Sequence, residues 1–125
     1  MKGVLIMEKG IFFITATKKE YKKQKQNFLI EKEGLIDNEL RVGFVYDEDY
    51  KQFTATDLNT GLAILSGYDN TIDYFIDIFY NTTLNSLLAF RNSYAYKNMV
   101  RVFEILKEYG EPMTDRKINN ILYKN

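Results

Sequence analysis

The stretch that decides the fold is LRVGFVYDEDYKQFTATDLNTGLAILS, residues 40–66. From Leu40 to Tyr46, apolar residues recur at every second position, which is the period of a half-buried strand. Residues 47–49 and 57–61 have turn composition, and Asn59 and Gly61 are good turn formers. The stretch therefore predicts an antiparallel meander of three strands, at about residues 40–46, 50–55 and 62–66.

The preceding residues predict further β-structure. Residues 4–7 and 11–16 have strand composition, and Gly10 suits a tight turn between them over Glu8-Lys9-Gly10. Thr17 and Glu20 match a capping box, which predicts a short polar helix to about Gln26; a lysine-rich loop is the alternative. A brief strand at residues 28–30 and a turn at Glu33-Gly34 follow. We expect about five strands in one sheet.

The C-terminal half predicts helices. Asp69 or Asn70 can cap a first helix, and residues 81–83 end it and cap a second. The second helix continues to Tyr109, unbroken or kinked at 92–93, before Gly110 and Pro112 stop it. Thr114 caps a last short helix. The fold class predicted is α+β, a single domain over residues 1–125 with residues 1–66 mainly antiparallel β and residues 69–123 mainly helical. One sheet face should be covered by Ile72, Phe75, Phe79, Leu87, Phe103 and Leu106.

Composition narrows the function. The chain has 125 residues, of which 46% are hydrophobic and 27% charged, as expected for one globular domain. It has no Cys and no His, so the usual nucleophile, general base and soft metal ligands are missing. We therefore expect a protein that is not an enzyme and uses no cofactor and no metal. No apolar run is long enough to span a membrane, which predicts a cytoplasmic protein without a membrane partner.

A lysine cluster occupies residues 18–25. It could contact the phosphates of a nucleic acid or nucleotide while its tyrosine stacks on a base. The alternative is a solvated surface, which the net charge of zero favours. The predicted polyanion-binding residues are Lys18, Lys19, Tyr21, Lys22, Lys23 and Lys25.

Two acidic sets form the second candidate. Asp69, Asp73 and Asp77 are four residues apart, so they line one face of the first predicted helix, and Asp47, Glu48 and Asp49 lie on a turn. These carboxylates could bind a basic partner surface, mimic nucleic-acid phosphates or hold Mg²⁺. The alternative is that they complement the helix dipole and face solvent.

Two segments carry resemblances. The hairpin TDLNTGLAI, residues 56–64, resembles one seen before a helix in many small phage and prophage proteins. VFEILKEYGEPMT, residues 102–114, running into residues 115–122, resembles the first two helices of a winged-helix DNA-binding domain. The recognition helix and the wing of that family have no counterpart before Asn125, so DNA reading does not carry over. Arg116 and Lys117 could still touch phosphates.

Small size, no evident chemistry, segregated charges and many tyrosines favour a binding protein, and the resemblance to phage and prophage proteins implies a phage or mobile-element type. Its expected partner is a host protein or ribonucleoprotein complex, such as a CRISPR nuclease that it inhibits in the host cytoplasm. The first alternative is a nucleic-acid or nucleotide binder, including a sponge for a signalling nucleotide, and a carboxylate-dependent metal enzyme is the second. A homo-oligomer could form through spare aromatic side chains: Phe90, Tyr94, Tyr96, Tyr109 and Tyr123.

Overall fold

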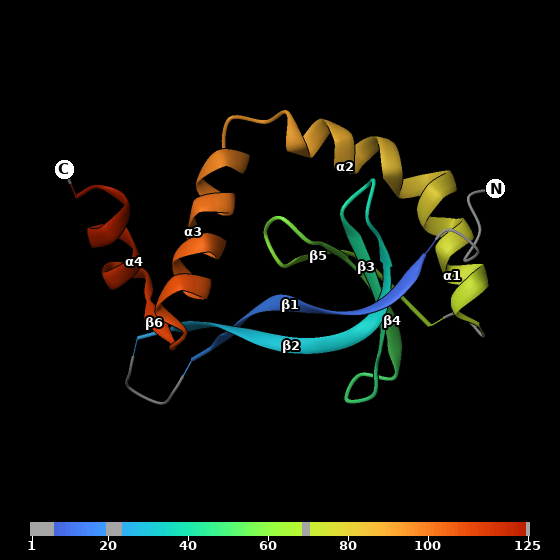
Figure 1. The fold of residues 1–125 in the computed structure, drawn as a ribbon, viewed down its shortest axis with the longest axis horizontal. Coiled ribbons are helices and arrows are strands. Elements are labelled where there is room, and N and C mark those ends of the chain that lie inside the picture. Colours follow the sequence, from blue (N-terminus) through green and yellow to red (C-terminus); the bar gives the residue numbers. More distant parts are fainter. Residues whose placement is uncertain (1–6, 20–23, 69–70, 125) are drawn as a thin grey trace.

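The structure is a computed structural model that describes residues 7–19, 24–68 and 71–124. It confirms the α+β class, with an antiparallel sheet followed by helices (Figure 1). The sheet is a meander in the order β1-β2-β3-β4-β5, and a short sixth strand pairs with β2. The strands are β1 Glu8–Lys18, β2 Gln26–Asp37, β3 Val42–Asp47, β4 Gln52–Asp57, β5 Leu62–Gly67 and β6 Met113–Thr114.

The first two strands are much longer than the sequence predicts. Residues 8–10 lie inside β1 and Glu33-Gly34 lie inside β2, so both predicted turns are wrong. The reason is close packing: a Cβ atom on Gly34 would lie 2.3 Å from the Phe44 carbonyl oxygen. Gly34 therefore allows neighbouring groups to approach the backbone and does not mark a turn.

The predicted helix after Thr17 is also wrong in its described part. Thr17 and Lys18 pair with Asn27 and Gln26 at the end of the β1–β2 ladder. Their backbone N–H and C=O groups are therefore engaged in the sheet and do not form helical hydrogen bonds. Residues 4–6, from the first predicted strand, and Glu20, from the predicted capping box, lie outside the described residues.

In the described residues after the meander lie four α-helices and one π-helical segment. They are α1 Ile72–Ile78, η2 Phe79–Thr83, α2 Leu84–Arg91, α3 Tyr96–Tyr109 and α4 Asp115–Leu122. The break predicted at residues 81–83 is wrong, because η2 joins α1 to α2 and the Thr82 hydroxyl donates to the Ile78 carbonyl at 2.6 Å. The chain leaves the helix at Asn92 and begins α3 at Tyr96.

The helix ends follow the predictions where they are described. Gly110 has a φ of 65° and ends α3. The Lys117 backbone amide donates to the Thr114 hydroxyl at 3.1 Å, which confirms Thr114 as the cap of α4. Thr71 caps α1 in the same way, while the predicted caps Asp69 and Asn70 lie outside the described residues.

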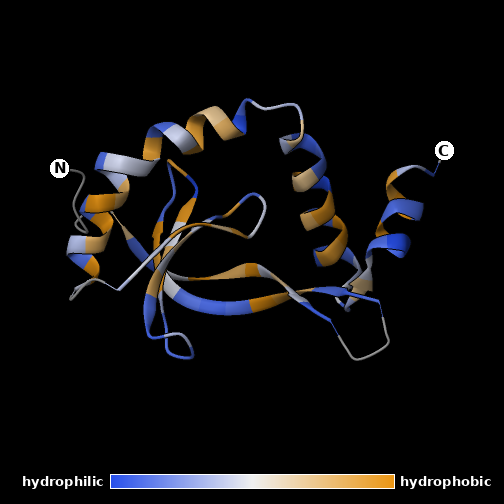
Figure 2. Ribbon diagram, turned by 180° about the vertical axis from the view of Figure 1, so that it is seen from behind, coloured by the Kyte–Doolittle hydropathy of each residue, from blue (hydrophilic) through white to orange (hydrophobic). Residues whose placement is uncertain are grey.

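Two hydrophobic clusters lie between the helices and the sheet (Figure 2). The larger one packs Phe75, Phe79 and Leu87 against Phe44, as predicted, with Ile72 partly buried beside them. Leu106 belongs instead to a second cluster that joins α3, β6 and α4. α3 turns away from α2 and packs over the far end of β2 (Figure 1), where Leu29 packs against the second cluster.

The sheet curls so that its first strand meets the turn after β4. The Thr15 backbone amide donates to the Gly61 carbonyl at 2.8 Å, and the Thr15 hydroxyl donates to the Thr60 carbonyl at 2.7 Å. A third apolar cluster contains Phe12, Val45 and Leu58. Successive side chains of a strand point to opposite faces of the sheet. Val45 follows Phe44, which faces the helices, so Val45 and its cluster partner Phe12 lie on the opposite, concave face of the sheet.

Candidate binding surfaces

Asp57, at the end of β4, is fully buried and holds the helical half on the meander. One carboxylate oxygen accepts from Arg91 of α2 at 2.7 Å, and the other accepts from the Tyr96 hydroxyl at 2.6 Å. The Thr60 hydroxyl adds a third bond at 2.9 Å. Arg91 also donates to the Leu40 carbonyl at 2.6 Å. With this many partners, the carboxylate has a structural role and is not free for chemistry.

Asp37, at the end of β2, forms a second carboxylate–tyrosine pair. The Tyr80 hydroxyl of η2 donates to Asp37, and the Leu40 amide donates to the same carboxylate at 3.0 Å. Burial, followed by the nearby carboxylate, raises the pKa of Tyr80 well above its ordinary value, and burial and Asp57 raise the pKa of Tyr96. Both tyrosines are thus held in the protonated, donating form.

A basic groove lies between the end of the β1–β2 hairpin and α4. Its lining residues come from both elements: Lys19, Gln24, Lys25, Asp115, Arg116, Asn119 and Asn120, around about 680 Å³. Asp115 accepts from Asn27 at 2.7 Å and lies 3.5 Å from the Lys25 ammonium, so part of the groove's positive charge is compensated. The fold thus brings two predicted lysines together with Arg116, although 91 positions separate Lys25 from Arg116 in sequence.

The rest of the lysine cluster is less well placed. Lys18 is exposed at the end of β1 but does not line the groove. Tyr21, Lys22 and Lys23 lie outside the described residues. Lys117, predicted with Arg116, pairs with Glu111 at 2.8 Å and thereby lowers the pKa of that carboxyl.

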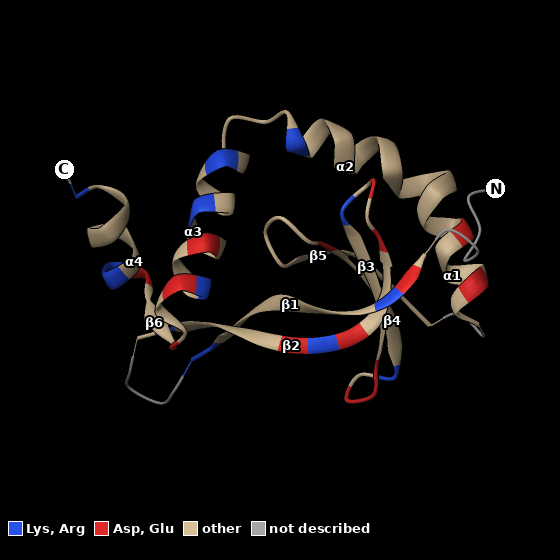
Figure 3. Cartoon of the chain, in the orientation of Figure 1, with Lys and Arg blue, Asp and Glu red and all other residues tan. Residues whose placement is uncertain are grey.

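Figure 3 shows acidic residues on the turn between β3 and β4 and on α1, and also on β2 and α3. Ring contacts link Tyr46 to Phe53 at 5.1 Å and Phe53 to Phe75 of α1 at 5.7 Å, which places the β3–β4 turn and α1 at one end of the sheet. Tyrosines lie among the acids, with Tyr50 70% and Tyr68 78% exposed. We call this the acidic–tyrosine surface: Tyr46, Asp47, Glu48, Asp49, Tyr50, Tyr68, Asp73 and Tyr74.

Not all predicted acids are equally available. Asp47 accepts from the Asp49 and Tyr50 amides at 2.9 and 3.3 Å, so one of its oxygens shapes the turn. Glu48, Asp49 and Asp73 are exposed, Asp77 is half-buried, and Asp69 lies outside the described residues. Glu48, Asp49 and Asp73 therefore carry the freely presented negative charge.

The predicted aromatic surface is partly wrong. Tyr96 is buried against Asp57, and Phe90 packs edge to face on it at 5.1 Å. Tyr96 belongs to the interior because it is the donor that buried Asp57 requires, and Phe90 is partly buried beside it. Tyr94, Tyr109 and Tyr123 are exposed, as predicted.

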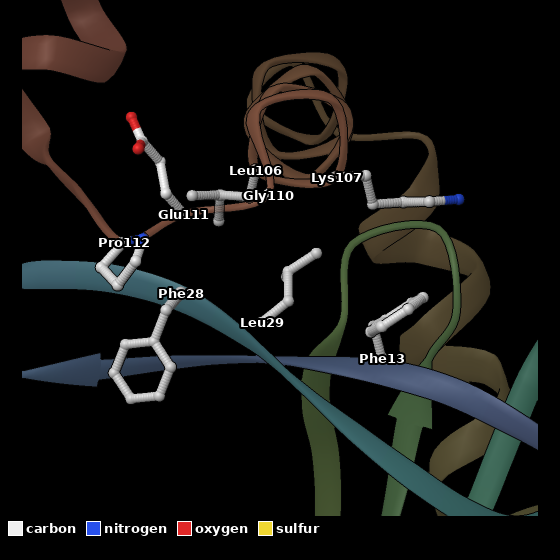
Figure 4. Close-up of a pocket in the computed structure, with 8 residues that line it drawn as sticks. All are labelled: Phe13, Phe28, Leu29, Leu106, Lys107, Gly110, Glu111 and Pro112. Carbon is white, nitrogen blue, oxygen red and sulfur yellow. The ribbon is translucent and has the colours of Figure 1, made fainter.

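An apolar groove of about 350 Å³ separates the hairpin from the end of α3. Figure 4 shows Leu29 of β2 beneath Leu106 of α3, with Lys107 and Glu111 at the edge. Phe13 and Phe28 complete its hairpin side. It contains no catalytic constellation, and its lining is that of a packing surface.

Across the described ranges 7–19, 24–68 and 71–124, no group of three or more acidic side chains lies close enough to hold a metal ion. Within the same part of the chain, no helix is long and apolar enough to cross a membrane. Neither a family model, nor a curated protein, nor a solved structure matches the chain.

Proposed function

We propose that this chain is a non-enzymatic binding protein of phage or mobile-element type that modulates a host protein complex, such as an antiviral CRISPR nuclease, from the cytoplasm. The observation that carries the proposal is the acidic–tyrosine surface, where exposed acids and tyrosines from two separate elements lie at one end of the sheet. Tyrosines supply contact area at low entropic cost, and carboxylates select a basic partner surface.

Nucleic-acid-handling proteins present such basic surfaces, because they bind phosphates. A chain of this size that presents acids and tyrosines together could occupy such a surface in place of a nucleic acid. The buried network at Asp57 supports this role indirectly, since it fixes α2 and α3 on the meander and gives the protein a rigid shape.

The test is quantitative pull-down from bacterial host lysate with wild type and with a triple variant, Glu48→Lys, Asp49→Lys and Asp73→Lys. We expect the wild type to enrich a defined host complex and the variant to lose at least about tenfold of that enrichment. The matched control, Glu31→Lys, Glu104→Lys and Glu108→Lys, makes the same change in net charge at exposed sites elsewhere. Equal loss in both triple variants, or no enriched complex, would contradict the proposal.

The basic groove favours a second candidate function, binding of nucleic acid or a nucleotide. Lys19, Lys25 and Arg116 converge there from two elements, and the Asn119 and Asn120 amides can add hydrogen bonds. Asp115 compensates part of the groove's positive charge, so this candidate ranks second.

Fluorescence anisotropy with single-stranded DNA tests it. If the groove binds phosphates, a Lys19→Ala, Lys25→Ala and Arg116→Ala variant should bind more weakly at low salt. Its log Kd should also depend less steeply on log salt, by about one unit of slope per lost phosphate contact. Lys51→Ala with Lys97→Ala is the control, since both residues are exposed outside the groove. Unchanged affinity in the groove variant would exclude this function.

A further inference from the structure

The concave face of the curled sheet contains a polar cavity of about 180 Å³, which touches the acidic–tyrosine surface only at Asp47 and Tyr50. Most of the lining side chains come from alternate positions of the strands, as expected for one face of a sheet, and Thr15, next to Ile14, and Gly61 also border the cavity. Its polar residues are Thr15, Lys32, Asp47, Tyr50, Gln52, Thr54, Thr56 and Ser66, and its apolar ones are Ile14, Val45 and Ala63.

Thr56, in β4, is the residue that points to a ligand. It is fully buried, and its hydroxyl has no hydrogen-bond partner within the described part of the chain. Its neighbours in the strand, Ala55 and Asp57, face the helices, so Thr56 faces the cavity. A buried hydroxyl without a partner is costly, and valine would fill the same volume without that cost. An occupant with polar atoms would supply the missing partner.

The other lining groups define the chemistry of the occupant. Hydroxyls of Thr54, Ser66 and Tyr50 can each donate and accept, which suits hydroxyl groups on the ligand. Lys32 and Asp47 bring opposite formal charges, so the cavity favours neither an anion nor a cation. Ile14, Val45 and Ala63 offer an apolar wall that suits the C–H face of a sugar ring.

We propose that this cavity binds one neutral sugar unit, held by the hydroxyls of Thr54, Thr56 and Ser66 against the apolar wall. The volume suits a single ring and no more, which sets an affinity on the order of 1 mM for an isolated monosaccharide. The site borders the acidic–tyrosine surface through Asp47 and Tyr50, but its three binding hydroxyls lie outside that surface, and it shares no residue with the basic groove.

Two-dimensional NMR of the ¹⁵N-labelled protein, titrated with D-glucose, D-galactose and D-ribose, tests the site. At least one of these sugars should give saturable shifts at the amides of Thr54, Thr56 and Ser66. A Thr54→Val and Thr56→Val variant should bind about tenfold more weakly, while Thr17→Val, exposed on β1 outside the cavity, should bind like wild type.

Thermal unfolding separates a lost contact from a lost fold. The single variant Thr56→Val breaks no described hydrogen bond, so its Tm should equal or exceed that of wild type while its sugar affinity falls. Three results would overturn the proposal: no saturable shift with any of the three sugars, unchanged affinity in the double variant, or binding of glucose 6-phosphate but not glucose.

Discussion

Replacing Asp57 by alanine is expected to lower the free energy of unfolding by about 3–5 kcal/mol, the cost of breaking a buried ion pair from one side. The Arg91 guanidinium would lose its carboxylate while still held by the Leu40 and Arg41 carbonyls, at 2.6 and 2.9 Å. The buried hydroxyls of Tyr96 and Thr60 would each lose an acceptor. Urea denaturation followed by circular dichroism measures the loss.

The control is Asp73→Ala, which removes an exposed carboxylate and should change stability by about 0.5 kcal/mol or less. Asp57→Asn keeps a side chain of the same shape with one acceptor oxygen, so its loss of stability should lie between those of Asp57→Ala and Asp73→Ala. A loss below about 1 kcal/mol for Asp57→Ala would mean that Asp57 does not hold the two halves together.

Alkaline pH is expected to unfold the protein through Tyr80 and Tyr96. Both hydroxyls donate to carboxylates, and the pKa of each is raised above the ordinary value of 10.0. A raised folded-state pKa means that the stabilisation is complete below pH 10 and is lost as the pH rises above it. Each such tyrosine costs about 1.4 kcal/mol of folding free energy for every pH unit above 10, until its folded pKa is reached.

Absorbance of tyrosinate against pH measures the ionisation, and circular dichroism recorded in parallel measures the unfolding. Tyr80 and Tyr96, whose pKa values are raised, should ionise in a late step that coincides with unfolding. Tyr80→Phe and Tyr96→Phe together should remove that late step, while Tyr94→Phe, an exposed ring, should leave it unchanged. Ionisation of all ten tyrosines near pH 10 with the fold intact would contradict the account.

Local patterns predicted most of the fold. Alternation in residues 40–66 correctly predicted three strands, and Gly110 and Thr114 correctly marked helix ends, because each signal acts within a few residues. The errors arose where distant contacts decide the structure. Gly34 has the composition of a turn, but it is a glycine because the Phe44 carbonyl packs against its backbone. Thr82 has the composition of a helix cap, but its hydroxyl donates to the Ile78 carbonyl inside a continuous helix.

The binding surfaces were predictable only in part. Residue types identified the lysines and the acids, but the grouping of Lys25 with Arg116, and of Glu48 with Asp73, depends on the fold. Asp57 and Arg91 were missed because Asp57, within the hairpin of residues 56–64, looks like an ordinary turn residue, and Arg91 lies in no motif. Its one sequence signal is an acid followed three residues later by Thr60, whose hydroxyl donates to it.

The central claim, that the acidic–tyrosine surface binds a host complex, is tested most directly by photocrosslinking in host cells. A benzophenone amino acid would replace Tyr50 or Tyr74 on that surface, or Tyr109 or Tyr123 at exposed positions elsewhere. The account predicts a discrete crosslinked host protein at Tyr50 and Tyr74 that is absent at Tyr109 and Tyr123. Crosslinks confined to Tyr109 and Tyr123, or none at any of the four positions, would contradict it.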